Sequence, residues 1–228
     1  DPGAGTDTRT SAGNTDVFLS KYDSGGAYQW TTAFGGPGND GGFIAVDSTG
    51  ILYVAGYFEN TVDFDPGAGT DTRTSAGSFD AYLSKYDSAG TYQWTRAFGG
   101  ADGDDEAVSI ATDSSGNVYI GGYFGNTVDF DPGAGTDTRT SVSSYDAFLS
   151  RYDSAGAYQW TKTFGGWANN LKIDTSGNIY AAGAFESSVD FDPGAGTDTK
   201  TSAGNYDAFL TKYTYDAIPP AIPIITNP

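Results

Sequence analysis

The chain has 228 residues, with 29 acidic and 11 basic side chains and a formal net charge of −18. A chain this acidic has no basic stripe to neutralise phosphates, which excludes a nucleic-acid-binding protein. Cysteine and histidine are both absent, so disulfides, thiolate nucleophiles and histidine-based catalysis are excluded as well.

The residue types predict strands and tight turns. Aspartate supplies 26 of the acidic residues and glutamate only 3, beside 33 glycines and 15% aromatic residues. Aspartate is a turn residue and a ligand of hard cations, whereas aromatic residues favour strands. No apolar run approaches the roughly 18 residues of a membrane-spanning helix, so we expect no membrane span.

The first segment of the chain, DPGAGTDTRTS, returns three more times, with Lys200 replacing arginine in the last copy. Copies of DPGAG begin at residues 1, 65, 131 and 192, at spacings of 64, 66 and 61 residues. Such a period determines the architecture. We predict one repeat domain over residues 1–215, followed by a linker or arm over residues 216–228 that contains four prolines.

Each period contains four strand-like runs. In chain order, the best-defined set lies at residues 80–87, 91–100, 107–113 and 117–124. Turns such as DSAG join the first run to the second, and turns such as DSSGN join the third to the fourth. Short Asp/Ser/Gly turns of this kind predict antiparallel hairpins.

The fourth run has large apolar side chains on both faces. Val118 and Ile120 alternate with Tyr119 and Tyr123, so this strand requires cover on both sides. A stack of small sheets provides such cover. The second run, YQWTRAF, places Tyr92, Trp94 and Phe98 on one face and Gln93 and Thr95 on the other, as expected of an outer, half-exposed strand.

The order DAFLSRYDSAGAYQWTKTFGG, followed by an Asp-Ser-Gly hairpin and a YxxGYF strand, resembles the SBBP-type β-propeller repeat of bacterial surface and secreted proteins. The resemblance covers residues 15 to about 213. It implies four-stranded blades, an extracellular or cell-surface location and no defined catalytic residues. We therefore expect an all-β, propeller-like array of four-stranded antiparallel blades, with about three repeats of 61–66 residues plus one extra strand.

The extra strand is the fourth copy of the first run, at residues 207–213. Propellers typically have about four to eight blades, so three repeats do not readily close a ring. This strand then leaves an edge without a partner. We expect the partners of the chain to be copies of itself or neighbouring repeats, joined through strand edges.

The aspartate loop suggests a metal site. Aspartates at alternate positions with glycine at the bend can offer oxygen ligands to Ca²⁺. The loop resembles, more weakly, the calcium loops of FG-GAP-type propellers, and departs from them where Gly67 replaces an aspartate. The predicted ligands in the three complete copies are Asp63, Asp65, Asp71, Asp129, Asp131, Asp137, Asp190, Asp192 and Asp198. The alternative is a Pro-Gly turn in which the aspartates cap backbone amides.

The other acidic positions favour structural roles. The loop ADGDDEA, with Asp102, Asp104 and Asp105, is expected to be a solvated surface with metal binding as the alternative. Asp113 of DSSGN is expected to close a turn. Every acidic pair recurs with the repeat, whereas an active site is normally unique, so we expect no enzymatic activity.

The recurring aromatic residues have two interpretations. Packing between blades is the first, and stacking on sugars at a blade mouth is the second. Together these features predict a non-enzymatic extracellular structural or adhesive scaffold, stabilised by calcium and self-assembling into a multimer or filament. The alternative is a carbohydrate-binding, lectin-like propeller that binds surface glycans at one shallow site per blade.

Overall fold

The computed structural model describes residues 5–214, and every helix or strand among them is a β-strand. No described segment is therefore a helix able to cross a membrane. The proline-rich segment predicted at residues 216–228 lies outside the described residues. The strands are β1 (Val17–Tyr22), β2 (Tyr28–Phe34), β3 (Gly41–Val46), β4 (Leu52–Asp63), β5 (Thr72–Tyr86), β6 (Tyr92–Phe98), β7 (Glu106–Thr112), β8 (Val118–Phe124), β9 (Thr127–Asp129), β10 (Thr138–Thr140), β11 (Asp146–Tyr152), β12 (Tyr158–Gly165), β13 (Trp167–Ile173), β14 (Ile179–Phe185), β15 (Ser188–Asp190), β16 (Thr199–Thr201) and β17 (Asp207–Tyr213).

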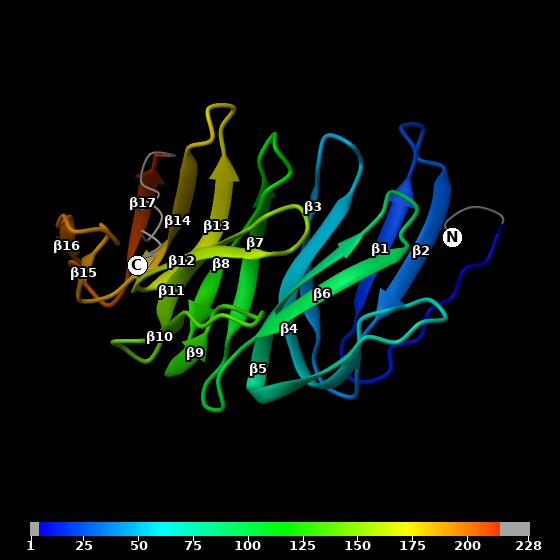
Figure 1. The fold of residues 1–228 in the computed structure, drawn as a ribbon, viewed down its shortest axis with the longest axis horizontal. Coiled ribbons are helices and arrows are strands. Elements are labelled where there is room, and N and C mark those ends of the chain that lie inside the picture. Colours follow the sequence, from blue (N-terminus) through cyan, green and yellow to red (C-terminus); the bar gives the residue numbers. More distant parts are fainter. Residues whose placement is uncertain (1–4, 215–228) are drawn as a thin grey trace, which may run out of the picture.

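Four of the sheets within residues 5–214 follow one another along the chain (Figure 1). We call them blade 1 (β1-β2), blade 2 (β3-β4-β5-β6), blade 3 (β7-β8-β11-β12) and blade 4 (β13-β14-β17). All strand pairs within the blades are antiparallel. The predicted all-β class with antiparallel four-stranded blades is thus confirmed for blades 2 and 3.

Blades and sequence repeats are out of phase. Each complete blade contains the third and fourth runs of one repeat, then the first and second runs of the next. The DPGAG segment therefore lies inside a blade, between its second and third strands. The predicted extra strand, β17, pairs with β14, and its other edge has no partner within residues 5–214.

The connection that carries DPGAG differs from a simple loop. Its arms pair as a two-stranded ribbon, as part of β4 and β5 in blade 2 and as β9-β10 and β15-β16 in the next two copies. Across the first ribbon, the hydroxyls of Thr61 and Thr74 lie 2.8 Å apart. Alternating threonines suit such a ribbon because β-branched residues favour extended backbone.

Thr95 also differs from its predicted position. Although we placed it on the exposed face of the outer strand, it is buried, and its hydroxyl lies 2.7 Å from that of Ser84 on the neighbouring strand. The hydrogen bond to the neighbouring strand satisfies the buried hydroxyl of Thr95. The pattern of large apolar residues does not predict this burial, because a threonine counts as polar in it.

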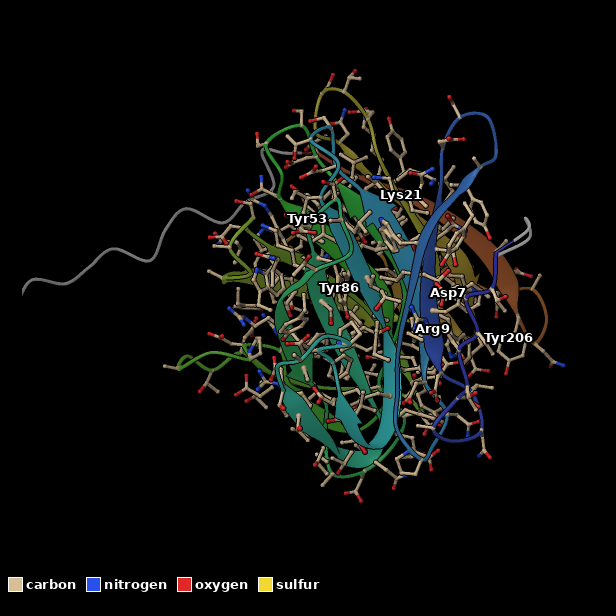
Figure 2. The ribbon with its side chains drawn as sticks, turned by 90° about the vertical axis from the view of Figure 1, so that its right-hand side faces the viewer. Asp7, Arg9, Lys21, Tyr53, Tyr86 and Tyr206 are labelled. Atoms are coloured by element: carbon tan, nitrogen blue, oxygen red, sulfur yellow. The ribbon has the colours of Figure 1, made fainter. Side chains whose placement is uncertain are left out.

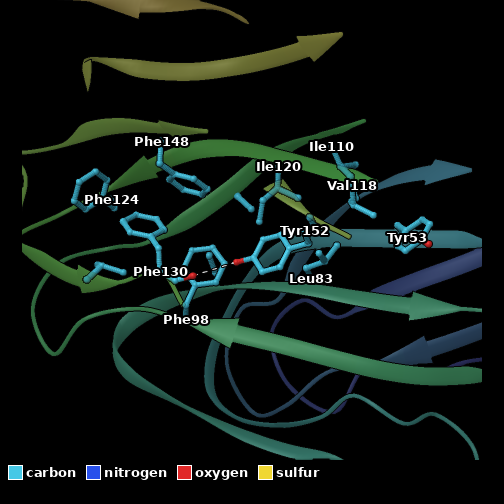
Figure 3. Close-up of a cluster of buried hydrophobic side chains, with 14 residues drawn as sticks. Tyr53, Leu83, Phe98, Ile110, Val118, Ile120, Phe124, Phe130, Phe148 and Tyr152 are labelled. Carbon is cyan, nitrogen blue, oxygen red and sulfur yellow. Dashed lines mark hydrogen bonds between the residues drawn. The ribbon is translucent and has the colours of Figure 1, made fainter. Parts of the chain in front are cut away.

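The core lies between the blades (Figure 3). At the junction of blades 2 and 3, the ring of Phe98 lies 5.3 Å from that of Phe130 and 5.7 Å from that of Phe148, between ring centres. The Tyr152 hydroxyl donates to the Phe130 carbonyl at 3.4 Å, so the only polar group of that ring is satisfied. The packing interpretation of the phenylalanines is confirmed, since Phe34, Phe98 and Phe164 are all buried.

Equivalent side chains are buried in the inner blades and exposed in the blades at the two ends. Phe148 is fully buried, whereas Phe18, at the same position of blade 1, is 69% exposed. Leu149 is fully buried, whereas Leu210, at the same position of blade 4, is 75% exposed. Each blade therefore has two apolar faces, and the described chain leaves one uncovered at each end.

We expect the substitution Phe148→Ala to lower the free energy of unfolding by about 3–5 kcal/mol, because it opens a cavity in a packed aromatic cluster. The matched substitution Phe18→Ala should change it by less than about 0.5 kcal/mol, since that side chain is exposed. Urea unfolding followed by tryptophan fluorescence measures both. Equal effects would contradict the assignment of the core to the blade junctions.

Candidate functional site

The aspartate loops close on their own backbone. In blade 2, Oδ1 of Asp63 accepts hydrogen bonds from the amides of Asp65 at 3.1 Å and Asp71 at 2.9 Å. Oδ1 of Asp65 accepts the amide of Gly67 at 2.8 Å. The equivalent bonds recur in the loops that begin at Asp129 and Asp190. These carboxylates therefore act as turn caps.

The last aspartate of each loop contacts the outer strand. Asp71 pairs with Arg73 at 2.8 Å and accepts a hydrogen bond from the Tyr92 hydroxyl. Burial and this carboxylate together raise the pKa of Tyr92. The contact fastens the ribbon to β6, and it recurs as Tyr158 with Asp137.

The first repeat carries the same group, in which Arg9 pairs with Asp7 at 3.2 Å (Figure 2) and Tyr28 donates to Asp7. Sequence reasoning missed this contact, although a signal was present. Aspartate and tyrosine are 21 residues apart in all three cases.

The predicted calcium ligands do not converge in this conformation. Within residues 5–214, no three or more acidic side chains are grouped so that they could hold a metal ion. In each loop, Oδ1 of each of the first two aspartates accepts backbone amides, and an arginine or lysine already pairs with the last aspartate. The donor set thus fits a capped turn better than a calcium site, and calcium binding stays a prediction.

Asp105 is the most buried acid of the second acidic loop. Its Oδ2 accepts the amide of Gly100 at 2.7 Å, and its Oδ1 accepts that of Gly125 at 3.1 Å. It therefore joins the connection between blades 2 and 3 to the end of β8. Burial raises the pKa of the Asp105 carboxyl from its ordinary value of 3.8 to about 7, although both amide bonds oppose the shift.

Asp40 makes the equivalent contacts at the preceding junction, with the amides of Gly36 at 2.7 Å and Glu59 at 3.2 Å. Burial raises its pKa too. The expectation of a solvated loop is thus wrong for Asp105, which is 1% exposed, and right for Asp102, which is exposed. Sequence alone could not separate them, because neighbouring aspartates give the same pattern.

Asp113 confirms the predicted turn role. Its Oδ1 accepts the amides of Ser115 at 2.8 Å and Asn117 at 3.0 Å. The equivalent Asp47 and Asp174 do the same in their hairpins. All three carboxylates hold the turn between the third and fourth runs.

Known proteins show the same repeat. Residues 93–123, from β6 to β8, match the family described as SBBP: Beta-propeller repeat. This segment is an SBBP-type β-propeller repeat. The matched segment spans the junction of blades 2 and 3, where Asp105 and the aromatic core lie.

Two larger proteins are similar to most of the chain. The chain is 30% identical over 210 residues to "Regulatory protein FlaEY" of Caulobacter vibrioides, which covers 86% of the chain and 21% of that protein. It is 28% identical over 182 residues to "Uncharacterized WD repeat-containing protein L264" of Acanthamoeba polyphaga mimivirus, covering 74% of the chain and 13% of that protein. The chain thus spans about a fifth or less of the length of these relatives.

Asp105 should make stability depend on pH. Because its pKa is about 7 in the folded state and near 3.8 when unfolded, the folded state binds the extra proton between these values. This contribution to stability is fully present below about pH 4 and is lost as the pH rises through about 7. We expect the urea midpoint to fall between about pH 5 and pH 8, and Asp105→Asn to reduce this slope.

The exposed neighbour provides the control. Asp102→Asn removes the same formal charge from the same loop and should leave the slope unchanged. If both variants kept the slope of the unmodified protein, the burial of Asp105 would not control its titration.

Proposed function

We propose that the chain is a non-enzymatic structural or adhesive scaffold of the bacterial cell exterior that assembles with copies of itself. One observation carries the proposal: the recurring polar groups hold the turns, ribbons and junctions of the blades in place. The Asp-Tyr-Arg contacts, the buried junction aspartates and the turn caps each recur with the repeat and are occupied by partners from the chain itself.

The acidic composition supports an exterior scaffold. Most of the aspartates cap turns at the ends of strands, where a carboxylate both satisfies backbone amides and remains hydrated. A net charge of −18 favours solubility and discourages unspecific association. Specific contacts between copies would then come from the uncovered blade faces.

Enzymatic activity has little support from the geometry. Acid–base catalysis requires carboxyl groups that face a substrate with oxygens free to exchange protons. Asp40 and Asp105 are buried, and both of their oxygens accept backbone amides. Their raised pKa values therefore accompany structural contacts.

The carbohydrate-binding alternative requires an exposed aromatic ring at each blade mouth. Trp30 and Trp94 are half-buried, and the hairpin of the following blade lies against each of them. This arrangement favours the scaffold, with glycan binding left as the second proposal. FlaEY is described as a regulatory protein, and a scaffold that presents a binding surface would also serve within a protein of that kind.

Self-assembly predicts a mass in solution that depends on protein concentration. We expect multi-angle light scattering of the purified chain to give a mass that rises with concentration above the 23.7 kDa of one chain. A constant mass of one chain up to millimolar concentration would contradict self-assembly.

Calcium stabilisation gives a separate prediction. If calcium stiffens the loops, removing it with EGTA should lower the melting temperature, and adding it back should restore the original value. Magnesium at the same ionic strength is the control, since screening of the −18 charge would act equally with either ion. An unchanged melting temperature would contradict a calcium site.

A further inference from the structure

One of the three blade junctions has a shorter connection than the other two. From the phenylalanine that ends the outer strand to the aspartate of the next hairpin, the sequence has 14 residues between blades 1 and 2, 16 between blades 2 and 3, and 11 between blades 3 and 4. We call residues 35–40 and 99–105 the junction loops, because they link the outer strand of one blade to the inner strand of the next. At the third junction, Gly166 alone separates β12 from β13.

The two junction loops pack on the end of a strand in the following blade. Between blades 1 and 2, Oε2 of Glu59 accepts the backbone amide of Asn39 at 3.1 Å and its side-chain amide at 3.2 Å. Between blades 2 and 3, a Cβ added to Gly103 would lie 3.1 Å from the Cα of Gly125, which occupies the position of Glu59. Each junction loop therefore fills the space beside that strand end.

The third junction has an open cleft instead. Its volume is about 480 Å³, and its lining comes from residues 140–146, 163–167 and 186–190, all of which the structure describes. The described chain ends away from it, since β17 runs from Asp207, paired with Phe185 next to the cleft, to Tyr213, paired with Ile179 at the other end of β14. Ligand pockets have volumes of roughly 300–1,000 Å³, so the cleft has room for a small ligand.

Glu186 in this cleft is the equivalent of Glu59. Each follows a phenylalanine that pairs with the first residue of a blade's third run, Phe58 with Asp80 and Phe185 with Asp207. Glu186 is half-buried, and within residues 5–214 its carboxylate has no hydrogen bond or ion pair. Because Glu59 accepts two neighbouring N–H donors, Glu186 offers the same acceptor to a ligand with two neighbouring donors.

An aromatic residue has moved into the same cleft. Ala184 replaces the tyrosine that Tyr123 represents in blade 3, and its cross-strand partner Trp167 provides a ring from β13. The Trp167 ring lies 5.3 Å from that of Tyr206, much as Tyr123 lies 5.5 Å from Tyr145. Both Trp167 and Tyr145 line the cleft, so a ligand there meets two aromatic side chains.

The remaining lining is polar and has no basic side chain within the described part of the chain. The hydroxyls of Thr140, Ser187 and Ser188 lie at exposed positions, and Asp190 adds a second carboxylate near Glu186. Such a lining repels an anionic ligand and suits a neutral one that carries many hydroxyls. A saccharide has this chemistry, because adjacent hydroxyls can donate to one carboxylate while the C–H face of the ring packs on an aromatic side chain.

We propose that the cleft between blades 3 and 4 binds a neutral saccharide of one or two rings. Glu186 accepts two adjacent sugar hydroxyls, and Trp167 packs against the sugar ring. The proposal goes beyond the scaffold function and does not depend on self-assembly. It locates glycan binding at a single junction, where the shortened connection opens the surface, instead of at every blade mouth.

The test titrates the full chain with maltose, cellobiose, lactose and N,N′-diacetylchitobiose by isothermal titration calorimetry. We expect at least one of these neutral disaccharides to bind with a Kd of about 1 mM or lower. Digalacturonate is the anionic comparator, and it should bind at least tenfold more weakly than that disaccharide. No binding of any neutral disaccharide up to about 20 mM would overturn the proposal.

Two variants locate the binding. Glu186→Gln keeps the shape of the side chain but replaces a charged acceptor by a neutral one, which should weaken binding at least tenfold. Glu59→Gln is the matched control in blade 2, where a junction loop covers the glutamate, and it should bind the sugar as the unmodified protein does. Unchanged binding in Glu186→Gln would place the sugar elsewhere and overturn the proposal.

A loop graft tests the cleft without changing any lining residue. Insertion of the sequence ADGDD after Gly166 gives the third junction the loop of the second, which should fill the cleft and abolish binding. A cooperative thermal transition shows that the variant is folded. Sugar binding that persists in the folded graft would contradict the proposal, and Glu186→Gln decides the matter if the graft does not fold.

A peptide is the competing ligand, because Asn39 of the chain itself is what Glu59 binds. The probe is the peptide GPGNDG, which has the sequence of residues 36–41. Binding of this peptide in place of every disaccharide, lost in Glu186→Gln, would overturn the saccharide assignment. Since Glu186 lies away from the uncovered faces of the end blades, Glu186→Gln should keep the mass of the unmodified protein in light scattering. A negative result for the sugar thus leaves self-assembly standing.

Discussion

The packing of one blade against the next is the constraint on which the rest of the structure depends. A sheet of two to four strands cannot by itself bury two apolar faces, and the complete blades have large side chains on both. The phenylalanine that ends each outer strand crosses the junction and packs on at least two rings of the following blade, as Phe98 does. Stability is therefore a property of junctions, and each blade is stabilised by its neighbours.

The polar groups follow from this constraint. Because apolar side chains occupy the junctions, the backbone at the strand ends must find its partners in turns, and aspartate provides them at the least volume. Asp105 shows that an aspartate used in this way can itself become buried. Its position at a junction brings two amides to its oxygens but also removes it from water, which is why its pKa rises. The same residue type thus caps hydrated turns elsewhere with the opposite effect, as the lowered pKa of Asp174 shows.

Much of this architecture was predictable from the sequence. The period of DPGAG, the four runs and the hairpin turns indicated the strands and their antiparallel pairing, since these are local signals. The phase between repeat and blade was not predictable, because it depends on which strand pairs with which across the DPGAG ribbon. The contact of Asp71 with Tyr92 and the burial of Asp105 were missed for a related reason: both arise where strands distant in the sequence meet. The alternation of Asp63 and Asp65 favoured a metal ligand set and a turn cap equally, and only the direction of their oxygens distinguishes the two.

The phase offset has a consequence for how such a protein changes in length. Because every complete blade takes two strands from each of two adjoining repeats, a duplication that starts at any point of the period adds one whole sheet. The new sheet brings its own turn caps, outer-strand phenylalanine and glycine hairpin. The side chains exposed on the first and last blades of the array stay the same. Gain or loss of repeats by recombination therefore requires no favoured breakpoint, and near-identical copies of the segment VDFDPGAGTDTRTS would be the natural record of such events.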